Sequence, residues 1–91
     1  MLNFLTEIIG DYCIKNNRFT IESVDNFDNK KLSIVLDFKN FKMISIEFLP
    51  NGILDLMVAD IESEEILSFE VSQVYTEETL KEKIIHFLDN I

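Results

Sequence analysis

Residues 31–71 read KLSIVLDFKNFKMISIEFLPNGILDLMVADIESEEILSFEV, and this stretch decides the fold. Apolar and polar residues alternate along it with a period of two, which is typical of β-strands that bury one face. Three short segments, Lys39–Lys42, Pro50–Gly52 and Ile61–Glu65, interrupt the alternation and are suited to turns. The pattern therefore predicts four consecutive antiparallel strands joined by short loops.

The turn at Pro50–Gly52 fixes the register of the two strands beside it. A three-residue loop pairs Phe48 with Leu54 and brings the apolar residues of both strands to the same face. Gly52 then takes the left-handed position that closes such a turn, and Pro50 presets the first one. A two-residue loop would slip the register by one residue and send the two apolar sets to opposite faces. We therefore expect the three-residue loop.

This register also brings two carboxylates together on the other face of the sheet. Glu47 is expected directly opposite Asp55, and like charges in that position destabilise a strand pair by roughly a few tenths of a kcal/mol or more. Two interpretations remain open: a solvated face that happens to be acidic, or a docking surface for a basic partner. The side chains expected on this outward face are Ser33, Val35, Asp37, Met43, Ser45, Glu47, Asp55, Met57, Ala59, Ser68, Glu70 and Ser72.

Helices are predicted at both ends of the chain. Apolar residues recur at helical spacing from Leu2 to about Ile14, and Asn16 and Asn17 follow, where Asn tolerates the left-handed conformation that ends a helix. Thr76 is expected to cap the N-terminus of the closing helix. The apolar stripe of that helix consists of Leu80, Ile84, Phe87, Leu88 and Ile91.

One strand is expected before the deciding stretch and one at its end. The first is Phe19–Val24, with Phe19 and Ile21 inward, and a loop over residues 25–29 follows it. The last strand is expected to bury Leu67, Phe69 and Val71. The sequence thus predicts one α+β domain over residues 1–91, in the order α-β-β-β-β-β-α. Its five-stranded antiparallel sheet carries the N- and C-terminal helices on one face and leaves the other open to solvent or a partner.

The charge of the chain limits its partners. The formal net charge is −9 and the isoelectric point is about 4.4. No Lys or Arg occurs between Met43 and Leu80, a region rich in Asp and Glu. Direct binding to nucleic acid or to an anionic membrane is therefore not expected, because both need a basic surface. Basic proteins are the partners that such a surface favours.

The residues that carry chemistry are few. His86 and Cys13 are the single His and the single Cys, and they lie on separate predicted helices, so an enzyme is not expected. We expect His86 to be exposed and Cys13 to pack in the core. Asp25 and Asp28 lack the spacing of an EF-hand loop, so no metal or cofactor is expected. A lone Cys and an acidic, leaderless N-terminal segment favour a cytoplasmic protein, and no apolar run is long enough to span a membrane.

The run from Lys31 to Val71, followed by TEETLKEKIIHFL, resembles the small immunity proteins of bacterial contact-dependent growth inhibition and polymorphic toxin systems, most closely the TriTu type. The resemblance covers about residues 30–89. A Trp expected near the turn is absent, and Phe48 stands in that region. The matching positions are Lys31, Ser33, Asp37, Phe38, Gly52, Asp55, Asp60, Glu77, Leu80, Phe87 and Leu88.

The resemblance implies a protein that binds and neutralises a cognate toxin, a basic tRNA-directed nuclease domain acting alone or with elongation factor Tu. If the outward face of the predicted sheet is the docking surface, we expect the partner-binding residues to be Glu47, Asp55, Met57 and Glu70, with Asp37, Asp60 and Glu62 at the rim. Two alternatives remain. One is a nucleic-acid-mimicking inhibitor of a host nuclease, which would use the same negative field, and the other is a dimeric secretion chaperone.

Overall fold

The alternation of residues 31–71 is realised as four strands of one antiparallel sheet. The computed structural model describes residues 2–27, 31–39 and 41–91. Their elements, in chain order, are α1 (Leu2–Asn16), β1 (Thr20–Asn26), β2 (Leu32–Phe38), β3 (Lys42–Phe48), β4 (Ile53–Asp60), β5 (Ile66–Gln73) and α2 (Glu77–Asp89). The strands lie in the order β1-β2-β3-β4-β5. The predicted α+β fold, with its element order, is confirmed.

The turn between β3 and β4 has the predicted register. Phe48 pairs with Leu54, and Glu47 pairs with Asp55. Gly52 adopts a φ of 88°, the left-handed conformation that L side chains rarely adopt. A Cβ atom at Gly52 would also overlap the carbonyl oxygen of Val74. The sequence of this turn is therefore constrained both by its own backbone and by the strand exit beside it.

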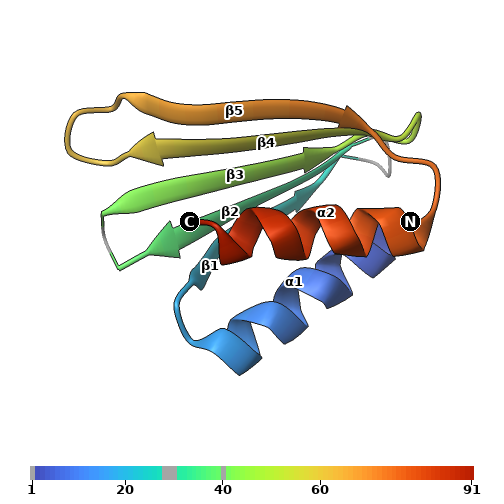
Figure 1. The fold of residues 1–91 in the computed structure, drawn as a ribbon, viewed down its shortest axis with the longest axis horizontal. Helices are drawn as coiled ribbons and strands as arrows, with labels where there is room; N and C mark the ends of the chain where they lie inside the picture. Colours follow the sequence, from blue (N-terminus) through green and yellow to red (C-terminus); the bar gives the residue numbers. More distant parts are fainter. Residues whose placement is uncertain (1, 28–30, 40) are drawn as a thin grey trace.

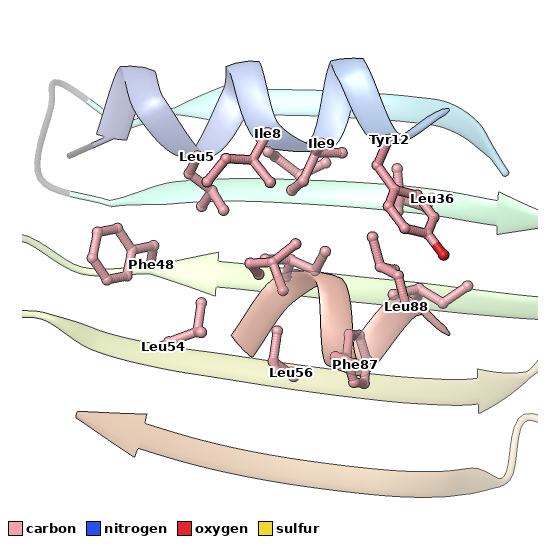
Figure 2. Close-up of a cluster of buried hydrophobic side chains, with 14 of the residues drawn as sticks. Leu5, Ile8, Ile9, Tyr12, Leu36, Phe48, Leu54, Leu56, Phe87 and Leu88 are labelled. Carbon is pink, nitrogen blue, oxygen red and sulfur yellow. The ribbon is translucent and has the colours of Figure 1, made fainter. Parts of the chain in front are cut away.

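Both helices lie on one face of the sheet, as predicted (Figure 1). Their apolar stripes meet the inward residues of β2, β3 and β4 in one core, part of which is drawn in Figure 2. Because each helix has one apolar stripe, the two helices together cover one sheet face and leave the other uncovered. The buried core consists of Leu5, Ile8, Ile9, Tyr12, Phe19, Leu32, Ile34, Leu36, Ile44, Ile46, Phe48, Leu54, Leu56, Val58, Val74, Leu80, Ile84, Phe87 and Leu88.

The ends of the helices carry the expected signals. Asn17 adopts a φ of 51° after α1, and the Thr76 hydroxyl accepts a hydrogen bond of 3.1 Å from the backbone N–H of Thr79. The Tyr12 hydroxyl donates to Asp89 Oδ1 over 2.6 Å and so joins α1 to α2. Burial, reinforced by Asp89, raises the pKa of Tyr12 to about 12, so the phenol remains a donor at neutral pH.

The prediction that the last strand buries Leu67, Phe69 and Val71 is wrong. Leu67, Phe69 and Val71 are 48%, 61% and 56% exposed. The reason is a β-bulge: Ile66 pairs with Ala59, but Ser68 pairs with Val58, so Leu67 is an extra residue. Beyond the bulge every side chain of β5 is on the opposite face from the one predicted. Phe69 therefore lies opposite Met57 instead of opposite the buried Leu56.

The first strand is also longer and more exposed than predicted. It spans Thr20–Asn26, so residues 25 and 26 of the expected loop belong to β1, while residues 28 and 29 lie outside the described residues. Phe19 is buried just before the strand, as expected. Ile21 pairs with Leu36 on the helix side but is 39% exposed, because β1 is an edge of the sheet.

Candidate binding face

The face of the sheet opposite the helices, here called the open face, is a surface built from alternate residues of all five strands. The registers of neighbouring strands align these residues in rows that cross the sheet. One row runs Ser23, Val35, Ser45, Met57 and Phe69. The next row runs Asp25, Ser33, Glu47, Asp55 and Val71.

The β3–β5 end of these two rows combines carboxylates with apolar side chains. A shallow hollow of about 120 Å³ is lined there by Ser45, Glu47, Asp55, Met57 and Phe69. Val71 lies beside the hollow, opposite Asp55. We call these six residues the acidic–apolar patch. A surface of this composition offers a partner both charge attraction and apolar contact.

The two facing carboxylates of the patch differ in their surroundings. Lys31 Nζ lies 3.4 Å from Glu47 Oε1, and this half-exposed ion pair relieves part of the repulsion from Asp55. Within the described parts of the chain Asp55 has no ion-pair partner of its own. Asp55 is therefore the carboxylate of the patch most available to a cation from outside.

The structure separates the predicted site residues into two groups. Asp37, Glu47, Asp55 and Met57 lie on the open face, as expected. Glu70 does not: it pairs with the buried Leu56, so it points to the helix side of the sheet. The expectation that Glu70 shares a face with Glu47 is wrong, and the bulge at Leu67 is the reason.

Two expected rim residues lie at the hairpin between β4 and β5. Asp60 Oδ1 accepts hydrogen bonds from the backbone N–H groups of Glu62 and Ser63, at 2.9 and 3.0 Å. These bonds, led by the one from Ser63, lower the pKa of Asp60. Asp60 thus caps the turn, whereas the side chain of Glu62 is exposed at its tip.

Sequence analysis missed three apolar residues of the open face. Ile66, Phe69 and Val71 are 60%, 61% and 56% exposed there. The sequence contained one signal of this. The alternate positions of β5 hold the polar residues Ser68, Glu70 and Ser72, which can lie on either face of the sheet. Alternation identified the strand, but it could not reveal a one-residue bulge that inverts the faces.

Two larger hollows lie on the helix side. One, of about 350 Å³, runs between α1 and α2 and is lined by the apolar residues Phe4, Ile8 and Ile85 together with charged residues of both helices. The other, of about 300 Å³, lies between α2 and β5 and includes Glu70 and His86. At the second hollow the helix side of β5 is not covered, since Ser68 and Glu70 are exposed there.

The residues with reactive side chains are not brought together. Cys13 is half-buried against the core, and burial raises the pKa of its thiol, which keeps it protonated at neutral pH. His86 is exposed on α2, as expected. In residues 2–27, 31–39 and 41–91 no group of three or more His, Cys, Asp and Glu side chains is arranged to hold a metal. Within the same ranges, every helix is too short or too polar to cross a bilayer.

No protein-family model, curated protein or solved structure matched this chain. The candidate site therefore rests on the geometry of the open face.

Proposed function

We propose that this protein is a binding module that neutralises a basic partner, and that it acts as an immunity protein for a cognate toxin domain. The observation that carries the proposal is the acidic–apolar patch on the open face. Asp55 opposes Glu47 across β3 and β4, an arrangement that weakens the strand pair and that the fold itself does not require. A cationic partner would convert this local cost into binding energy.

The distribution of charge supports the same proposal. The patch lies in the segment between Met43 and Leu80, which contains no Lys or Arg, in a chain of net charge −9. A field of this sign attracts a cationic protein and speeds its association, mainly at low ionic strength. A nuclease is a suitable target, because the basic surface that holds RNA phosphates is the surface that an acidic inhibitor can occupy.

The residues of the patch have separate roles in this proposal. Asp55 and Glu47 contact cationic side chains of the toxin, and Met57 with Phe69 provides the apolar centre that excludes water from those contacts. Asp37 lies farther out on the open face, and Glu62 lies at the hairpin tip. Asp60 and Glu70 contribute to the surrounding negative field.

The test is a binding measurement with the purified C-terminal domain of the protein encoded immediately upstream, at low and high salt. We expect tight binding whose association rate falls as salt rises. Asp55→Lys should slow association by about tenfold at low salt. Glu82→Lys is the matched control, because Glu82 is exposed on α2, on the other side of the molecule, and carries the same charge change.

Two results would contradict the proposal. Equal effects of Asp55→Lys and Glu82→Lys would mean that overall charge, and not the open face, controls binding. Absence of binding to the upstream domain, with capture of a host nuclease instead, would favour a nucleic-acid-mimicking inhibitor.

A further inference from the structure

The strand β5 is exposed to an unusual degree for a strand of this composition. It pairs with β4 on one side, and in the described residues no strand pairs with its other side. Seven of its eight residues are exposed, including Ile66, Phe69 and Val71. Long apolar edge strands are templates for the addition of another strand, so proteins usually protect them.

The opposite edge of the same sheet has such protection. On the open face β1 presents Thr20, Ser23 and Asp25, which are small or charged. The open face of β5 instead presents three apolar side chains. The difference between the two edges cannot come from their position, because both strands are terminal in the sheet.

The bulge at Leu67 directs the apolar side chains of β5 to the open face. Without it Phe69 would lie opposite Leu56, on the helix side. With it Phe69 lies opposite Met57 and Val71 lies opposite Asp55. Phe69 thereby becomes part of the acidic–apolar patch.

The backbone N–H and C=O groups of Phe69 and Val71 point to the free edge of the sheet. The Val74 N–H donates to the carbonyl oxygen of Gly52 over 2.7 Å, which sets the phase of the β4–β5 ladder. Hydrogen-bonded and non-hydrogen-bonded pairs alternate in an antiparallel ladder. Counting back from Val74, the backbone groups of Val71 and Phe69 point away from β4. Phe69 and Val71 therefore offer both side chains on the open face and unpaired amides at the edge.

The charges at the ends of β5 select the kind of strand that can add. Glu64 and Glu65 precede the strand, and Glu77 and Glu78 follow it. If a second copy of this chain added its β5 at this edge, parallel or antiparallel, the carboxylates of its hairpin or its α2 would lie close to these glutamates. The like charges would repel each other. A strand that carries Lys or Arg would be attracted at the same positions.

We infer that β5 accepts an extended, cationic strand of a protein partner, which adds to the sheet as a new edge strand. The added main chain bonds to Phe69 and Val71, and its apolar side chains cover the apolar part of the patch on the open face. Its basic side chains, at the alternate positions, point to the helix side beside Glu70 and lie near the flanking glutamates. This inference rests on the proposed function in supposing a basic partner, and it identifies the segment of that partner.

The test is independent of the upstream domain. A short synthetic peptide that alternates lysine with valine is titrated into the isotopically labelled protein, and amide hydrogen exchange is followed residue by residue. The amides of Phe69 and Val71 should exchange rapidly in the free protein and slow by about tenfold or more with saturating peptide. A peptide that alternates glutamate with valine is the matched control and should give no protection.

Three outcomes would overturn the inference: equal protection by the glutamate peptide, protection confined to other residues, or no protection by either peptide. Protection that rises with protein concentration alone would assign the edge to a second copy of the chain instead. Val71→Pro removes one edge amide and leaves the β4 ladder intact, so it should abolish peptide protection at Phe69 while the thermal unfolding of the domain stays cooperative. If the peptide binds and the upstream domain does not, the proposed toxin partner fails and the edge inference stands.

Discussion

β4 and β5 lie side by side, have the same length and carry similar alternating sequences, yet their environments are opposite. Leu54, Leu56 and Val58 of β4 are at most 6% exposed. Phe69 and Val71 of β5 are more than half exposed. The apolar residues of β4 belong to the core beneath the two helices, part of which Figure 2 shows. The difference follows from the faces of the sheet: β4 turns its apolar side chains toward the helices, whereas the bulge in β5 turns Phe69 and Val71 to the open face.

The largest effect that separates the two strands is on stability. Leu56→Ala should lower the free energy of unfolding by about 2–5 kcal/mol, because it leaves a cavity in a closed core. Phe69→Ala removes a larger side chain, but from the surface, and should lower it by less than about 1 kcal/mol. Urea unfolding of both variants measures the difference. A loss of several kcal/mol in Phe69→Ala would mean that β5 is buried in solution, by self-association or by a different register.

The same contrast explains which features of the fold could be predicted from the sequence. Between Phe48 and Leu54 the register followed from the turn, because a slip would have exposed a whole apolar face. No such penalty acts on β5, since neither of its faces is packed. Its register follows from the hairpin and from the bulge at Leu67, and residue alternation carries no information on either.

The residues of the candidate site were predicted correctly or wrongly for the same reason. Glu47 and Asp55 were predicted as an opposed pair because both lie on strands whose inner faces are buried. Glu70 was placed on the wrong face, and Phe69 and Val71 were missed, because all three lie beyond the bulge. The sequence could therefore specify the carboxylates of the patch and not its apolar edge.

A pair of engineered cysteines tests the bulge directly. Met57 and Phe69 are a non-hydrogen-bonded pair, in which opposing Cα atoms lie close together, so Met57→Cys with Phe69→Cys should form a disulfide on oxidation. The disulfide should raise the free energy of unfolding by about 2–3 kcal/mol. Cys13→Ala in both double variants prevents competing pairs. Leu56→Cys with Phe69→Cys is the control, and preferential oxidation of that pair would indicate the register without a bulge.

The smallest expected effect concerns the two carboxylates that face each other. Asp55→Asn removes the repulsion from Glu47, and the free energy of unfolding should rise by about 0.2–1 kcal/mol. Glu47→Gln also removes the repulsion but loses the ion pair with Lys31, so its gain should be smaller. Chemical denaturation at low salt, repeated at high salt where both gains should shrink, measures the difference.

The direction of the Asp55→Asn effect distinguishes a surface shaped for stability from one shaped for binding. Natural domains accept local destabilisation where a surface has another task, and the cost here falls on the strand pair beside the uncovered strand. A variant that is more stable and binds its basic partner more weakly would assign the carboxylate to recognition. A variant that is less stable would show that Asp55 supports the sheet, and the acidic character of the open face would then need no partner to explain it.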